Sequence, residues 1–224
     1  MDTQRLPYDF IRFDYKERLT DRYLATHLHR FEIFAKPVAI AILIEINSPW
    51  HPSSEFGQKI INSLVKEFSQ SQAQSFLSRF EHALKKTNKI IKAASENTAS
   101  PIGIVALLLE SNQVHASGVG SIKLGLIRHN RLASIINGKS EQTNAFNAVS
   151  SGDMFENDWI ILANTNFYKI IQSLDLTIFN QSQTEDIAEQ IITSKPDPRL
   201  SAAGLLFKFS PDNISQTQTV FWDS

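Results

Sequence analysis

"ASPIGIVALLLESNQVHASGVGSIKLGLIRHNRL", residues 99–132, is a series of apolar runs separated by short polar turns. The runs are "IGIVALLLE", "QVHASGV" and "IKLGLIR", and "RLASII" follows. Ser111-Asn112, the small-residue loop "SGVGS" and His129-Asn130 separate them. Asparagine tolerates a positive φ, so both polar pairs can close β-hairpins. We therefore predict an antiparallel meander, with the small-residue loop as a turn between paired strands.

The segments on either side predict further strands and helices. On the N-terminal side we expect strands over residues 10–15, 22–28 and 38–46, then helices that begin at Ser53 or Ser54 and at Ser75. On the C-terminal side we expect the strand "DWIILAN", helices over residues 167–173 and 184–194, and the strands "AAGLLFKFS" and "TQTVFWD". Runs of strands with paired helices between them indicate an α+β layered fold. We treat residues 1–224 as a single domain.

Composition excludes several classes of function. A net charge of -1 and a pI near 6.6 give no global attraction to nucleic acid or to an anionic membrane. The apolar run 38–46 is shorter than the roughly 20 residues that cross a bilayer. The chain has no cysteine, which excludes disulfides, thiolate zinc sites and a cysteine nucleophile. No signal peptide is evident at the N-terminus, so we expect a cytoplasmic protein.

The order of elements resembles the PPM (PP2C-type) metal-dependent serine/threonine protein phosphatase family, from about Arg18 to Phe209. "GVGSIK" lies where that family has "NVGDSR", and "NDWIILANTNF" lies where it has "G-D", an apolar run and "S-D-G". "LSAAGLLFKF" lies where "D-N-x-T" opens the last apolar strand. The resemblance implies a four-layer α-β-β-α sandwich, two antiparallel sheets each flanked by a helix pair. It also implies two Mg²⁺ or Mn²⁺ ions, held by aspartates, and a bridging water that attacks phosphorus.

Most of the aspartates that the resemblance implies are replaced. The replaced positions are Ser121, Thr165 with Asn166 in place of the following glycine, and Leu200 with Ser201 in place of the following asparagine. The first metal aspartate of the family falls near Glu45 to Asn47. Asp21 matches a further acidic position, and Arg18 is a candidate phosphate ligand. Two divalent ions close together need several anionic oxygen ligands, so we expect no dinuclear centre.

This pattern predicts a PP2C-like pseudophosphatase that needs no cofactor. Such a module would bind a small regulator or another protein, with a phosphoprotein or a kinase as candidates. The alternative is a residual phosphatase that uses one Mg²⁺ or Mn²⁺ held by Asp21, Glu45 and either Asn47 or Thr165. A third hypothesis is a structural subunit that assembles through surface aromatics. The candidate aromatics are Trp50, Phe56, Trp159 and Trp222.

Three other polar groups are weaker candidates. His27 and His29 share a strand face and could bind a metal, but no third ligand is evident. His51 is a candidate acid or base, although an ordinary loop histidine is the simpler interpretation. "SGDMFENDW", which contains Asp153, Glu156 and Asp158, lacks the ligand spacing of a calcium loop, and we predict a surface turn.

The remaining patterns indicate no enzyme class. "SGVGS" precedes no helix, which excludes a P-loop, and no serine lies in a G-x-S-x-G elbow. An N-terminal-nucleophile hydrolase shares the layered class, but no processing site before a strand is apparent. The lysines of the second long helix form a predicted solvent-exposed face, with a patch that binds phosphate or a partner as the alternative. They are Lys85, Lys86, Lys89 and Lys92.

Overall fold

The computed structural model describes residues 6–15, 22–47, 53–95, 101–137, 145–181, 183–194, 201–211 and 217–222. The strands are β1 (Tyr8–Tyr15), β2 (Arg22–Ile33), β3 (Lys36–Asn47), β4 (Ile102–Glu110), β5 (Gln113–Val119), β6 (Lys123–Arg128), β7 (Arg131–Ile136), β8 (Ser150–Asp153), β9 (Trp159–Ala163), β10 (Ala203–Phe209) and β11 (Thr217–Trp222). The helices are α1 (Ser53–Gln70), α2 (Phe76–Ser95), α3 (Thr165–Ser173), α4 (Ile178–Gln181) and α5 (Thr184–Thr193).

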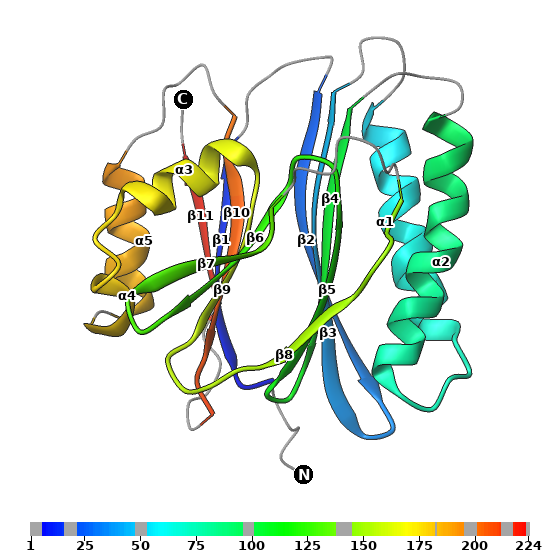
Figure 1. The fold of residues 1–224 in the computed structure, drawn as a ribbon, viewed down its shortest axis with the longest axis horizontal. Helices are drawn as coiled ribbons and strands as arrows, with labels where there is room; N and C mark the ends of the chain where they lie inside the picture. The colour runs from blue at the N-terminus through cyan, green and yellow to red at the C-terminus, as the bar shows by residue number, and fades with distance from the viewer. Residues whose placement is uncertain are drawn as a thin grey trace.

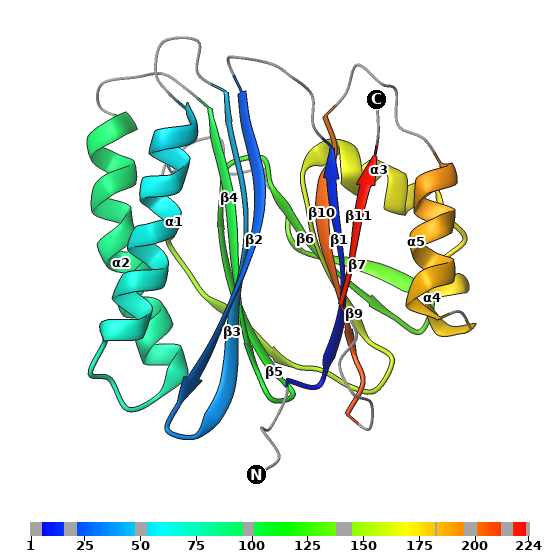
Figure 2. The same ribbon diagram turned by 180° about the vertical axis from the view of Figure 1, so that it is seen from behind.

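The strands form two sheets that pack face to face (Figure 1). One sheet has the order β11-β1-β10-β9-β6-β7 and the other has the order β2-β3-β4-β5-β8. Helices α1 and α2 cover the outer face of the five-stranded sheet, and α3, α4 and α5 cover the outer face of the six-stranded sheet (Figure 2). The predicted α+β sandwich with helices on both outer faces is therefore confirmed.

The apolar runs of β3 and β4 are continuous because these strands are buried on both faces. Ile40, Ile42 and Ile44 pack under α1 and α2, whereas Leu43 and Leu107 face the other sheet. Helix α1, together with α2, supplies the outer half of this core with apolar side chains at helical spacing. The buried apolar side chains of α1 are Ile60, Ile61, Leu64 and Phe68.

The predicted meander is wrong at the small-residue loop. The polar pairs at residues 111–112 and 129–130 do close the hairpins β4–β5 and β6–β7, but β5 pairs with β4 and β8, and β6 pairs with β7 and β9. The loop between β5 and β6 therefore crosses from one sheet to the other. Gly120 makes this crossing possible: its φ is +70°, and a Cβ there would lie 2.0 Å from the carbonyl oxygen of Ile102.

Three further details differ from the sequence prediction. Strand β11 pairs with β1 in parallel, so the six-stranded sheet is mixed rather than wholly antiparallel. Strand β8 and the short helix α4 were not predicted. Strand β2 continues to Ile33, where Phe34 and Ala35 form the turn into β3 with φ values of 56° and 55°. No helix among the described residues combines the length and apolar character of a membrane span.

Candidate functional site

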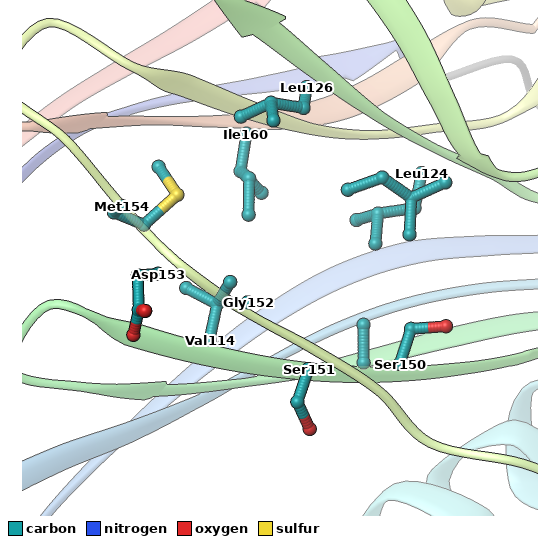
Figure 3. A pocket seen from close by; sticks show the side chains of 11 residues that line it. Val114, Leu124, Leu126, Ser150, Ser151, Gly152, Asp153, Met154 and Ile160 are labelled. Atoms are coloured by element: carbon teal, nitrogen blue, oxygen red, sulfur yellow. The ribbon is translucent and has the colours of Figure 1, made fainter.

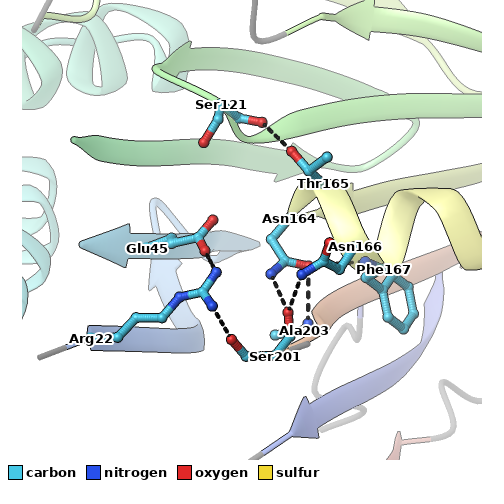
Figure 4. Close-up of polar contacts among 9 residues, drawn as sticks. All are labelled: Arg22, Glu45, Ser121, Asn164, Thr165, Asn166, Phe167, Ser201 and Ala203. Atoms are coloured by element: carbon cyan, nitrogen blue, oxygen red, sulfur yellow. Dashed lines mark hydrogen bonds and ion pairs between the residues drawn. The ribbon is translucent and has the colours of Figure 1, made fainter. Parts of the chain in front are cut away.

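One end of the sandwich contains an ion pair between the two sheets (Figure 4). Arg22 begins β2, and its guanidinium donates to the carboxylate of Glu45 near the end of β3. The same guanidinium donates to the hydroxyl of Ser201, which precedes β10 of the other sheet. Exposed fractions are 22% for the Arg22 side chain and 7% for the Glu45 side chain. Arg22 thus links the two sheets through a nearly buried carboxylate.

Two asparagine amides fix the segment that carries Ser201. Asn164 Nδ2 donates to the Ser201 carbonyl oxygen at 2.9 Å, and Asn166 Nδ2 donates to the same oxygen at 3.0 Å. Asn164 also caps α3, because its Oδ1 accepts from the backbone N–H of Phe167 at 3.0 Å. The backbone N–H of Ala203 donates to Oδ1 at 3.3 Å. One buried amide therefore positions both α3 and the start of β10.

A third contact joins two of the positions at which the resemblance implies aspartates. The hydroxyl of Thr165, at the start of α3, donates to the carbonyl oxygen of Ser121 at 3.3 Å. Ser121 lies in the crossing loop between β5 and β6. Five of the positions that the resemblance assigns to the site thus lie at the same end of the sandwich (Figure 4): Glu45, Ser121, Thr165, Asn166 and Ser201.

Solved phosphatase structures have this arrangement of sheets and helices. The S. agalactiae serine/threonine phosphatase matches with a TM-score of 0.66 at 10% identity, over 91% of this chain and 98% of its own. The chain has the PP2C phosphatase fold. The catalytic domain of PstP, solved in complex with 2 manganese ions, matches with a TM-score of 0.60 at 10% identity, over 91% of this chain and 97% of its own.

A PP2C-fold phosphatase of Bacillus subtilis is also similar. The phosphatase domain of SpoIIE matches with a TM-score of 0.52 at 12% identity, over 99% of this chain and 98% of its own. No protein-family model and no curated protein sequence matches the chain. The resemblance seen in the sequence is therefore supported by similarity of fold.

The described side chains do not fit the divalent ions that the PP2C fold implies. Among the described positions that the resemblance assigns to metal binding, Glu45 alone has a carboxylate, and Arg22 already neutralises it. Hydroxyls and amides add no negative charge, which two adjacent divalent ions require. Within the described ranges no group of three or more His, Cys, Asp or Glu side chains could hold a metal ion.

Several predicted site residues cannot be placed in this network. Arg18, Asp21, His51 and Leu200 lie outside the described residues, so their roles stay predictions. Asn47 is exposed at the end of β3, where it pairs with Arg22 of β2, and its backbone N–H donates to the carbonyl oxygen of Pro101 at 3.2 Å. Sequence reasoning missed Arg22 and Asn164. The Asn164 position before a short helix is an N-cap signal that could have identified it.

His27 and His29 share one face of β2, as predicted. Their rings stack with centroids 6.0 Å apart and planes inclined by 6°. Desolvation by burial lowers the pKa of both imidazoles, and the charge of His29 lowers the pKa of His27 further. This environment favours neutral rings.

The predicted surface turn around Asp158 is only partly correct. Asp153 ends the exposed edge strand β8, whereas Asp158 is 2% exposed. Arg128 Nε donates to Asp158 Oδ1 at 2.9 Å, and the backbone N–H of Phe155 donates to Oδ2 at 2.7 Å. The hydrogen bond to Asp158 raises the pKa of Arg128. The carboxylate of Asp158 thus stabilises the loop through a guanidinium.

The predicted surface aromatics also need correction. Trp159 is fully buried, and its indole N–H donates to the Phe179 carbonyl oxygen at 2.9 Å. Phe56 is half-buried, and neither Trp50 nor the side chain of Trp222 is among the described parts of the chain. Among the side chains that the structure describes, the exposed large aromatics are Phe34 and Phe155. Trp159 is therefore not a surface aromatic through which the protein could assemble.

A small cavity opens between the two sheets beside β8 (Figure 3). Its volume is about 70 Å³, and its lining includes Val114, Leu124, Met154 and Ile160. Sites for drug-sized ligands occupy about 300–1,000 Å³. This cavity is therefore a packing defect rather than a cofactor site.

Proposed function

We propose that this protein is a pseudophosphatase, a PP2C-fold module that binds another protein and does not hydrolyse phosphoesters. The supporting observation is the Arg22–Glu45 pair, which occupies the end of the sandwich where the resemblance implies metal ions. A guanidinium in contact with the carboxylate competes with a divalent ion for the same oxygen atoms. Binding of a metal there would require the ion pair to break.

The groove between α1 and α2 suggests the chemistry of the protein partner. Phe56, Lys59, Lys89 and Ile90 line a groove of about 390 Å³. All four predicted surface lysines of α2 are exposed, and residues 83–95 contain no acidic side chain. Apolar surface flanked by positive charge complements an acidic amphipathic segment. We therefore assign this groove to an acidic segment of the partner protein.

The catalytic part of the proposal is tested with Mn²⁺ and Mg²⁺. We expect calorimetry to show no binding at micromolar metal, and we expect no hydrolysis of p-nitrophenyl phosphate or of phosphopeptides. Metal-dependent turnover that is lost in Asp21→Ala or Glu45→Ala would overturn the proposal. It would instead establish the residual one-metal phosphatase.

The binding part is tested with a defined amphipathic helical peptide of Glu and Leu, and with a Lys and Leu peptide of the same pattern. We expect fluorescence anisotropy to show micromolar binding of the acidic peptide only, weakened by salt. Lys59→Glu combined with Lys89→Glu should reduce the affinity at least tenfold. Lys66→Glu, which changes an exposed lysine of α1 outside the groove lining, is the matched control. Equal losses of peptide affinity in the Lys59/Lys89 double variant and in Lys66→Glu would refute the assignment.

A further inference from the structure

A serine, a histidine and a glutamate lie in contact on the five-stranded sheet, away from the site described above. His115 Nδ1 lies 2.7 Å from the hydroxyl oxygen of Ser151 on the adjacent strand β8. His115 Nε2 lies 3.9 Å from Glu110 Oε2 at the end of β4. The imidazole thus has a hydroxyl at one ring nitrogen and a carboxylate near the other.

Alternation along the strands places these side chains on the sheet face toward α1 and α2. Val114 and Ala116 face the space between the sheets, so His115 points to the opposite face. Ser151 is paired with His115 in the β5–β8 register, and its side chain is directed away from the inter-sheet cavity (Figure 3). His115 is 6% exposed, whereas Ser151 is exposed. A buried imidazole therefore contacts a hydroxyl that solvent can reach.

The Glu110 carboxylate, 3.9 Å from Nε2, favours the tautomer that carries its proton on that nitrogen. A proton on Nε2 points toward Glu110, whereas a lone pair there would be repelled by the carboxylate. With the proton on Nε2, Nδ1 accepts a hydrogen bond, so the Ser151 hydroxyl donates. Desolvation by burial lowers the pKa of His115, while the charge of Glu81 on α2 opposes this effect. The ring is therefore neutral near pH 7 and able to take a proton.

We propose that Ser151 is a nucleophile activated by His115, with Glu110 as the positioning residue, and that it accepts acyl groups from carboxylic esters. A nucleophile within hydrogen-bond reach of a base that a third group orients is the arrangement that activates serine. This activity is independent of the proposed pseudophosphatase function, because its residues lie on a different face of the sheet.

The proposed reaction has two balanced steps. Ser151 Oγ forms a bond to the acyl carbon, the bond from that carbon to the alcohol oxygen breaks, and His115 Nδ1 passes the serine proton to the departing alkoxide. Water then attacks the acyl carbon with His115 as the base, the bond to Ser151 Oγ breaks, and the proton returns to Oγ. The products are the alcohol and the carboxylic acid.

A fluorophosphonate probe tests the nucleophile directly, because it forms an Oγ–P bond and releases fluoride. We expect intact-protein and peptide mass spectrometry to place one label on Ser151. Ser151→Ala should remove it. Ser150→Ala changes the neighbouring exposed serine of the same strand and should label at the original rate. p-Nitrophenyl acetate should give a Ser151-dependent burst of p-nitrophenolate.

Variants of the other two residues separate activation from structure. His115→Asn should slow labelling about 100-fold, the contribution typical of a general base. Glu110→Gln should shift the pH profile of labelling to a lower midpoint, since the carboxylate favours the protonated ring. The charged groups facing this ring are Glu110 from β4 and Glu81 from α2, and Lys36 from β3 acts on Glu110. Absent labelling of Ser151, or an unchanged rate in folded His115→Asn, would overturn the proposal.

Discussion

Replacement of Arg22 by methionine should destabilise the protein and leave the Glu45 carboxylate without its cation. Methionine keeps most of the length and apolar character of the arginine stem but removes the guanidinium. The Glu45 side chain is 7% exposed and lies between the sheets. Water therefore cannot fully replace the lost hydrogen bonds.

The expected loss follows from the burial of the pair. Removing one partner of a buried ion pair costs about 3–5 kcal/mol of unfolding free energy. The Arg22 side chain is 22% exposed, so some water already reaches it, and we expect about 3 kcal/mol, the lower end. For a domain of this length, that corresponds to a decrease in Tm of roughly 6–12 °C.

Urea unfolding followed by circular dichroism measures this loss in Arg22→Met, Glu45→Gln and the double variant. The double variant should be more stable than Arg22→Met alone, because it contains no buried unpaired charge. At 1 mM Mn²⁺ the Tm of Arg22→Met should shift by less than about 1 °C, since a single carboxylate binds the ion weakly. Additive losses in the double variant, or recovery of Tm with Mn²⁺, would refute our account of the ion pair.

Three further predictions concern other parts of the fold. Gly120→Ala should lower the unfolding free energy by at least about 2 kcal/mol in urea titrations. The reason is that a Cβ would lie 2.0 Å from a carbonyl oxygen and that φ is +70°. Gly152→Ala is the control, because a Cβ there meets nothing within 4 Å. Asp158→Asn should lower the unfolding free energy by about 2–4 kcal/mol in the same assay, because Arg128 loses the carboxylate to which it donates. A loss below ~0.5 kcal/mol, the scale of surface substitutions, would contradict this role. Burial lowers the folded-state pKa of His27, His29 and His115, so the unfolded state binds protons more readily. Stability should therefore fall as the pH decreases below the unfolded histidine pKa of about 6.5. Urea midpoints that do not change from pH 7.5 to 5 would contradict this prediction.

The order and type of most elements were predictable because their apolar patterns are long and periodic. Strand pairing at the small-residue loop was not, since alternation tells which residues are buried but not which sheet the next strand joins. Strand β8 has the sequence "SSGD" and all four residues are exposed, so it gave no apolar signal. Its hydrogen bonds to β5 define it. Asp158 was assigned to the surface because its partner Arg128 lies 30 residues away.

The sequence named some of the residues that lie together at the candidate site and missed others. Ser121, Thr165 and Ser201, named from the replaced motifs, lie at one end of the sandwich. Nothing in the local sequence distinguishes Arg22 from a surface arginine. Its contacts to Glu45 and Ser201 span 23 and 179 residues, respectively. Such contacts depend on how the sheets pack, which single-sequence patterns do not report.

The Arg22 guanidinium offers a physical reason why neutral side chains suffice at the replaced positions. Two divalent ions would bring four positive charges between the sheets and would require several carboxylates to offset them. One guanidinium brings one positive charge, and Glu45 offsets it alone. Its fixed N–H groups reach both a carboxylate on one sheet and a hydroxyl on the other, so it can link the sheets as bound metal would. The Arg22–Glu45 pair is therefore balanced in charge without the aspartates that the resemblance implies at Ser121 and Thr165.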